Sequence, residues 1–190
     1  MTEYQPKLPV AAIAFPPPIV GQSVTEVVAA QGLKQMHLAE SEKERMVSYY
    51  FDGLKEERFA GEQVVIVDSP KTATYDKKPE MSVFEVVEEF EKALSTSVYK
   101  FFMLNFANPD MVAHTGNLKA AIRACEYTDE AVGRVVEAVL TYGGTIVVTA
   151  DHGNAEDLLT FGSAGYFFAK GQGEVNTEHS NHPVPVMIIS

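Results

Sequence analysis

Residues 100–116, KFFMLNFANPDMVAHTG, give the clearest indication of the fold class. The first seven of these residues are almost all apolar, which predicts a buried strand over 100–106. Asn108 and Pro109 then predict the start of a short helix, with Asn108 as its N-cap and Pro109 in the first helical position. A buried strand that runs directly into a helix is typical of α/β proteins, in which ligands gather at the carboxyl ends of the strands.

The alternation of strands and helices continues on both sides of this stretch. Helix 82–94 precedes it, a long helix from about Asn117 to Tyr142 follows it, and apolar strands are expected at 145–150 and 184–190. Upstream, the composition predicts further elements, which are a strand at 8–15, a helix from Ser23 to near Gly32, a strand at 34–39, a helix at 41–50 and a strand at 64–68. This spacing predicts an α/β fold with a mostly parallel sheet and helices on both faces.

Several finer expectations concern burial. The strand at 145–150, TIVVTA, is predicted to be fully buried. The long helix has an apolar stripe that is predicted to face the core and to include Cys125 as a small core residue; its members are Leu118, Ile122, Cys125, Val132, Val135 and Val139. Residues 69–81 and the glycine-rich 161–173 are expected to be irregular. Because the last apolar strand reaches Ser190 with no helix after it, we expect the sheet to be incomplete at this end and also at the other.

Composition and charge exclude several classes of protein. The 190 residues carry a formal charge of −11 and contain no Lys/Arg-rich run, so we expect neither a nucleic-acid nor an anionic-membrane partner. Cys125 is the only cysteine, which leaves no disulfide framework and fits a reducing compartment. No apolar run reaches the ~18 residues of a membrane span, and the N-terminus does not read as a signal peptide. These features predict a cytoplasmic protein.

Aspartate and histidine recur where three of the predicted segments end. Asp110 and His114 are spaced i,i+4 after strand 100–106, so both side chains lie on one face of the short helix. Asp151 and His152 directly follow strand 145–150, and His179 lies in the segment TEHSNH before the last strand. Together these five side chains offer enough oxygen and nitrogen ligands for two divalent cations, with positions left for phosphate oxygens. Since no thiolate is present, the ligand set suits Mn²⁺ or Zn²⁺ better than Mg²⁺.

Each cluster taken alone also has a purely structural interpretation. Asp110 could complement the start of its helix and His114 could cap its end, while Asp151 could simply cap the segment that follows it. A single loop histidine is usually exposed, and we favour that interpretation for His182.

Three motifs resemble a known family. NFANPDMVAHTG (105–116), TADHGNAE (149–156) and the run from His179 to Pro185 are similar to those of the cofactor-independent (2,3-bisphosphoglycerate-independent) phosphoglycerate mutases, in the alkaline phosphatase superfamily. AESEK (39–43) and SPKTATYD (69–76) agree with the same family. The resemblance spans essentially the whole chain and implies an alkaline phosphatase-like sheet.

The resemblance also implies an activity. The family interconverts 3-phosphoglycerate and 2-phosphoglycerate through a phosphoserine intermediate, with two metal ions, usually Mn²⁺, and without bound 2,3-bisphosphoglycerate. By this resemblance Asp110, His114 and His179 hold one metal ion, and Asp151 with His152 contributes to the second. The full-length protein is expected to be a monomer that acts on these small molecules.

The resemblance also gives Lys43 a role, as the match to a lysine that contacts the transferring phosphoryl group. Without the resemblance, Lys43 in Glu42-Lys43-Glu44-Arg45 is better interpreted as a solvated lysine of an acidic helix.

Family members are much longer, and their nucleophilic serine, a further metal-binding aspartate and an arginine-rich substrate domain have no matching motif here. We therefore interpret 1–15 as the end of the substrate domain, 16–24 as a hinge, and 25–190 as the C-terminal part of the metal-binding phosphatase-like domain. A chain without a nucleophile is expected to be inactive alone.

Two alternatives remain open. The first is a phosphopentomutase or another metalloenzyme of the alkaline phosphatase superfamily, because the metal motifs barely separate these classes. Segments 39–53 and 69–81 favour the glycerate mutase. The second is a non-catalytic metal-binding remnant that has kept the fold.

Overall fold

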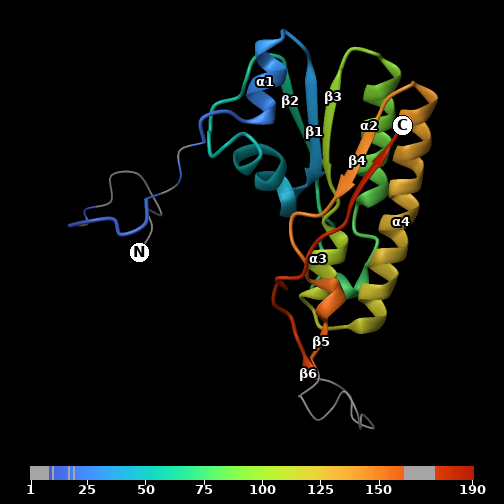
Figure 1. Cartoon of the computed structure of the whole chain (residues 1–190). Helices are drawn as coiled ribbons and strands as arrows, with labels where there is room; N and C mark the ends of the chain where they lie inside the picture. The colour runs from blue at the N-terminus through green and yellow to red at the C-terminus, as the bar shows by residue number, and fades with distance from the viewer. Residues whose placement is uncertain (1–8, 10, 17, 19, 161–173) are drawn as a thin grey trace.

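The structure, a computed structural model, describes residues 9, 11–16, 18, 20–160 and 174–190 (Figure 1). The glycine-rich segment expected at 161–173 lies outside the described residues. Residues 9 and 11–15 of the segment expected as a strand form no part of the sheets described below. No helix in the described part of the chain has both the length and the apolar character that crossing a bilayer requires.

A three-stranded parallel sheet forms the centre of the fold. Its strands are β1 (Gln35–Glu40), β2 (Glu62–Val67) and β3 (Phe101–Asn105), in the order β2-β1-β3. Leu38 of β1 pairs with Val65 on one side and with Leu104 on the other. Three apolar segments that are far apart in sequence therefore assemble into the parallel sheet that the sequence predicts.

Helices cover both faces of this sheet (Figure 1). Met36 and Leu38 point to one face, where they share a core with residues of α2 (Val83–Ser95), and α4 (Leu118–Thr141) packs against α2. Gln35 and His37, which alternate with them along β1, point to the other face, toward α1 (Val24–Ala30) and the helical turn η2 (Met46–Tyr50). The prediction of helices on both faces is confirmed.

The helix expected over 41–50 is irregular. It starts as a 3₁₀ turn, η1 (Ser41–Lys43), and widens into the π-helical turn η2 before Gly53, which has a φ of +74°. π-helical turns are rare and occur often at functional sites. Between β2 and α2, residues 69–81 contain only the short 3₁₀ turn η3 (Tyr75–Lys77), as the sequence indicates.

The short helix after β3 is α3 (Asn108–Ala113), and its N-cap is Ala107 rather than Asn108. Asn108 is buried instead, and its side chain donates to the carbonyl of Ala124 (3.0 Å) and accepts from the hydroxyl of Thr128 (3.0 Å). The side chain of Asn108, which we expected to cap α3, therefore links α3 to α4, because its amide group makes hydrogen bonds to α4 in place of a local one.

The buried side of α4 agrees with the prediction only in part, because Val135 is buried and Val139 packs against the core while other predicted members are exposed. The long helix turns small side chains inward, and the buried ones are Ala120, Ala121, Ala124, Ala131 and Val135. Leu118, Ile122 and Cys125 are exposed, so the prediction of Cys125 as a core residue is wrong. Alanine side chains allow α2 and α3 to pack closely against α4. Close packing of this kind stabilises the fold more than burying a larger side chain at a wider helix–helix distance would.

The two last predicted strands, β4 (Ile146–Thr149) and β7 (Val186–Ile189), form an antiparallel pair of their own. The expectation that 145–150 is fully buried is wrong, because Val147 is 59% exposed, and Val186 and Ile188 are 67% and 72% exposed. The remaining short elements lie near the candidate site, and they are η4 (Ala155–Asp157), β5 (Leu159–Thr160) and β6 (Glu174–Val175).

Candidate metal centre

The sheet topology brings the candidate residues to one end of the molecule. Lys43 lies in the turn after β1, Asp110 lies in α3 just after β3, and Asp151 follows β4 after one intervening residue. The segment that carries His179 is held against them by one backbone bond, from the amide of Ser180 to the carbonyl of Gly153 (2.8 Å). A Cβ atom at position 153 would overlap the side chains of Glu156 and Ser180, so glycine allows this close approach without displacing them.

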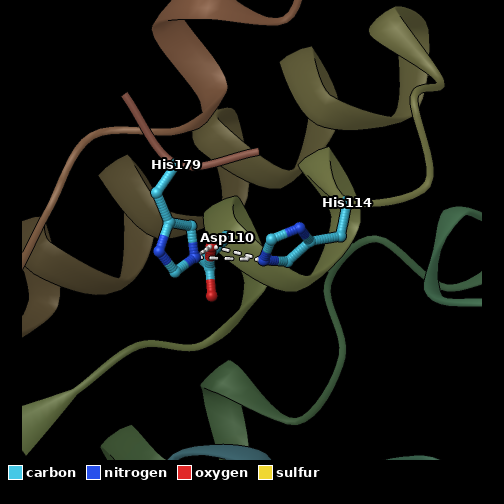
Figure 2. A group of neighbouring side chains, drawn as sticks. All are labelled: Asp110, His114 and His179. Atoms are coloured by element: carbon cyan, nitrogen blue, oxygen red, sulfur yellow. Dashed lines mark hydrogen bonds and ion pairs between the residues drawn. The ribbon is translucent and has the colours of Figure 1, made fainter. Parts of the chain in front are cut away.

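Three of the predicted ligands point toward a common centre (Figure 2). Oδ1 of Asp110 lies 3.1 Å from Nε2 of His114 and 3.3 Å from Nε2 of His179. The two imidazole nitrogens are 3.2 Å apart. Residues separated by 65 positions in the sequence therefore offer one oxygen and two nitrogens to a single point.

A cation suits this arrangement for a specific reason. Nδ1 of His114 lies 2.6 Å from the carbonyl oxygen of Thr177, which can only accept, so Nδ1 carries the proton of the neutral ring. The lone pair of Nε2 then faces the carboxylate of Asp110. Lone pairs that face one another repel unless a positive charge lies between them, and a backbone carbonyl that fixes the tautomer is typical of metal-binding histidines. The residues present thus fit a divalent ion with nitrogen and oxygen ligands.

Lys43 binds the other side of the same carboxylate. Its Nζ lies 2.7 Å from Oδ2 of Asp110 and 3.9 Å from Oδ2 of Asp151, and the residue is buried. Burial alone would raise the pKa of Asp110, but hydrogen bonds from Lys43 and Asn154 outweigh it and hold the pKa below its ordinary value. Asp110 is therefore an anion that faces the imidazoles with one oxygen and the ammonium with the other.

Asp151 and His152 lie beside this cluster without joining its three-atom centre. Oδ2 of Asp151 lies 3.7 Å from Nε2 of His152 and 3.4 Å from the amide nitrogen of Asn105. The His152 ring stacks on His179, with 3.7 Å between centroids. Nδ1 of His152 and Oδ1 of Asn105 are buried with no hydrogen-bond partner among the described residues, which is costly for polar atoms unless a ligand binds them. These orphaned atoms favour a second ligand position here.

His182 carries an exposed side chain (61%) that lies 3.5 Å from Oε1 of Glu156. The favoured interpretation of this histidine as an exposed loop residue agrees with the structure.

Asn154 is a residue that the sequence analysis did not single out. Its side-chain nitrogen donates to Oδ1 of Asp110 (2.6 Å) and lies 3.3 Å from Nε2 of His114, and the residue is buried. It therefore contacts two members of the three-atom centre. The position of Asn154 just after the candidate ligands Asp151 and His152 indicated that its side chain could contact a ligand. Only the fold shows that the ligands it contacts are Asp110 and His114.

We expect Asn154→Ala to lower the affinity of the chain for Mn²⁺ roughly tenfold, because an outer partner that orients a ligand typically contributes that much. Isothermal titration of the metal-free chain with Mn²⁺ measures this change. Asn117→Ala is the matched control, since the side-chain nitrogen of Asn117 donates to Oδ2 of Asp76 (3.1 Å) and to none of the candidate ligands. Equal affinities in the two variants would contradict the role given to Asn154.

Comparisons with known proteins agree with this geometry. The chain is 44% identical over 189 residues to the 2,3-bisphosphoglycerate-independent phosphoglycerate mutase of Symbiobacterium thermophilum, a match that covers 100% of this chain and 35% of the relative. It is 46% identical over 178 residues to the enzyme of the same name from Thiobacillus denitrificans, covering 94% of this chain and 33% of that one. The chain thus spans about a third of the length of these relatives. They confirm the resemblance noted in the motifs.

A solved structure gives the same result for the fold. The phosphoglycerate mutase of Leishmania mexicana, crystallised at low cobalt concentration, superposes with a TM-score of 0.84 at 32% sequence identity. The match covers 91% of this chain and 32% of that one. The sequence profile of the metalloenzyme superfamily matches residues 7–190. With the profile covering nearly its whole length, the chain belongs to the metalloenzyme superfamily.

Proposed function

We propose that this chain is the metal-binding part of a phosphoglycerate mutase that interconverts 3-phosphoglycerate and 2-phosphoglycerate through a phosphoserine intermediate, independently of 2,3-bisphosphoglycerate. The observation that carries the proposal is that the two oxygens of the Asp110 carboxylate have different partners. Oδ1 faces two imidazoles, and Oδ2 faces the ammonium of Lys43. One residue thus joins a candidate metal site to a candidate phosphoryl-binding cation. Similarity to named mutases along the whole chain supports the same activity.

In this proposal Asp110, His114 and His179 hold one divalent ion, and Asp151 and His152 contribute to a second. Mn²⁺ is the proposed metal, because carboxylate and imidazole ligands without thiolate suit it, as they also suit Zn²⁺. When bound, the ions supply positive charge that neutralises the oxygens of the transferring phosphoryl group.

Lys43 has the second part of the proposed chemistry. Its ammonium is held in place by Asp110 at 2.7 Å and is shielded from water. A fixed, dehydrated cation stabilises charge that develops on phosphoryl oxygens more strongly than a mobile one. The chain itself offers no motif for the serine nucleophile, so we expect no turnover by these 190 residues alone.

The domain assignment belongs to the same proposal. Residues 1–15 would end a substrate domain, 16–24 would form the hinge, and 25–190 would belong to the phosphatase-like domain. The full-length protein would act as a monomer in the cytoplasm. Val20 supports a defined path for the connector, because it packs so closely against Gly53 that a Cβ there would lie 2.8 Å from its Cγ1.

A chimera tests the proposed function. We replace the matching third of the Symbiobacterium thermophilum mutase with residues 1–190 and assay the Mn²⁺-loaded protein on 3-phosphoglycerate and on ribose 1-phosphate. Mutase activity on 3-phosphoglycerate, lost by about a thousandfold on Lys43→Met, is the expected result. Activity only on ribose 1-phosphate would instead support a phosphopentomutase. A folded, metal-loaded chimera with neither activity would favour the non-catalytic remnant.

A further inference from the structure

A second group of buried polar residues lies away from the candidate metal centre, on the sheet face that α1 and η2 cover. His37 of β1 is fully buried there, and its Nδ1 lies 2.7 Å from the backbone carbonyl of Val47 in η2. The carbonyl can only accept, so Nδ1 donates. Burial lowers the pKa of His37, which keeps the ring neutral and leaves its one proton for this bond.

The rest of the environment fixes the ring in place. The other ring nitrogen faces Oε1 of Gln35 at 3.4 Å without a hydrogen bond, because neither atom carries a proton in this tautomer. The amide nitrogen of Gln35 donates instead to the carbonyl of Thr25 in α1 (2.9 Å). Phe51 and Phe101 meet the ring edge to face, with centroids 5.4 and 6.2 Å away. A buried ring that contacts two phenyl rings can hold the segment to which it is hydrogen-bonded.

Asp52 and Glu62 also lie near His37, but these three residues do not form a second metal site. One guanidinium nitrogen of Arg58 lies 3.1 Å from Asp52 and 3.2 Å from Glu62, so it already supplies the positive charge that both carboxylates need. Nδ1 of His37 is occupied by the carbonyl of Val47. The group is better explained as an anchor for the chain that follows β1.

That chain carries Lys43. Residues 41–50 form one helical stretch, in which Val47 comes one turn after Lys43. Val47 is fully buried and bonded to His37, and Asp52 just beyond the stretch is bonded to Arg58. Moving this turn would move the backbone from which the Lys43 side chain reaches Asp110.

We propose that His37 is a positioning residue for Lys43: by donating to the carbonyl of Val47 it holds the wide turn in the place that keeps the Lys43 ammonium buried against Asp110. The binding of phosphate by Lys43 rests on the proposed function, whereas the position of the Lys43 side chain is independent of that function. Among the described residues, His37 is the side chain that bonds the backbone of η2 to the central strand.

The test compares two substitutions that differ in one donor. His37→Leu places a methyl group where Nδ1 stood and leaves the buried Val47 carbonyl without its partner. His37→Asn keeps a donor at the same distance along the side chain. An amine-reactive reagent labels lysines by exposure, and peptide mass spectrometry follows Lys43 against the exposed Lys119 in the same sample.

We expect His37→Leu to raise the labelling rate of Lys43 roughly tenfold, with Lys119 unchanged, because losing a buried hydrogen bond shifts a local equilibrium by about that factor. His37→Asn should stay near the parent rate. Val87→Ala, a fully buried site on α2, lowers stability elsewhere and should leave the ratio of Lys43 to Lys119 labelling unchanged. If the leucine variant fails to fold, His37→Met, which also lacks a donor, replaces it with the same expectation.

Three results would overturn the inference. A folded variant without the donor could keep the parent labelling rate at Lys43, or His37→Asn could raise that rate as much as His37→Leu does. Val87→Ala could also raise the ratio of Lys43 to Lys119 labelling by the same factor. The proposed function is judged separately, by titrating the Mn²⁺-loaded chain with inorganic phosphate. If Lys43→Met leaves phosphate affinity unchanged while the labelling result holds, the phosphate role of Lys43 fails and the positioning role of His37 stands.

Discussion

His114→Ala is expected to weaken Mn²⁺ binding by this chain on the order of 100-fold or more, because the substitution removes one of the three atoms that meet at the candidate centre. It also removes the nitrogen whose lone pair is fixed toward Asp110 by the carbonyl of Thr177. Isothermal titration of the metal-free protein gives the affinity directly.

Thermal unfolding gives an independent measure of the same change. Mn²⁺ at about 100 times its dissociation constant should stabilise the parent by about 2.7 kcal/mol, which for a protein of this size raises Tm by roughly 5–10 °C. A 100-fold weaker site at the same metal concentration retains only about 0.4 kcal/mol of that effect. Without metal, the variant should unfold near the parent temperature, because the loss of the bond to the Thr177 carbonyl is offset by relief of repulsion among the converging acceptors.

His182→Ala is the matched control for this substitution. It removes the same side chain from the neighbouring loop, where the ring is exposed and 3.5 Å from Glu156. This variant should keep the full thermal response to Mn²⁺. A His114→Ala protein with an equally large response would show that the three converging side chains do not hold the metal.

Glu40→Gln should remove most of a pH dependence of stability that the parent shows between about pH 4.5 and 7. Glu40 is buried at the end of β1, and its Oε1 accepts the backbone amide of Ser82 (3.0 Å). Oε2 is buried with no hydrogen-bond partner in the described part of the structure. Burial raises the pKa of Glu40 from its ordinary value of 4.5 to about 7.

The direction of the effect follows from proton binding. Between the two pKa values the folded protein holds a proton that the unfolded chain releases, so the free energy of unfolding falls as the pH rises through this range. The loss approaches about 3 kcal/mol above pH 7, since each pKa unit corresponds to about 1.4 kcal/mol. Glutamine keeps the acceptor for Ser82 but carries no charge, so the variant should exceed the parent in stability at pH 8 and match it near pH 4.5.

Urea unfolding at several pH values between 4.5 and 8 measures these differences. Glu88→Gln is the control, because Glu88 is an exposed acid on the neighbouring helix α2. Its curve should run parallel to that of the parent. If the Glu40→Gln curve also runs parallel to the parent, the buried carboxyl group does not titrate as its environment indicates.

The sequence predicted the elements of the fold better than their packing. The parallel sheet followed from apolar runs such as 100–106, and the start of α1 followed from Ser23, whose hydroxyl accepts the amide of Glu26 as a capping box requires. The buried side of α4 followed only in part: Val135 and Val139 face the core as predicted, but the first turns of the helix do not, because the helices that pack there set that side. Leu118 is exposed while Ala124 is fully buried, although hydrophobicity alone favours the reverse.

The candidate site shows the same division. Aspartate and histidine at the ends of predicted strands located Asp110, His114 and His179, since strand ends meet at one edge of a sheet. The contacts of Asn154 and His37 depend on loops folding back across 40 and 10 residues, and no local pattern encodes such distances. Sequence reasoning therefore found side chains that could bind a ligand and missed those that orient them.

The antiparallel β4–β7 pair has a consequence for how this chain behaves at high concentration. Val147, Val186 and Ile188 of this pair are more than half exposed, and within the described residues each strand is hydrogen-bonded to the other alone. Open strand edges with apolar side chains are templates onto which other molecules can add their own strands. The net charge of −11 opposes such contacts by repulsion, and salt screens that repulsion over about 10 Å at 0.1 M. Ionic strength should thus control aggregation of this chain, with turbidity appearing as salt is added.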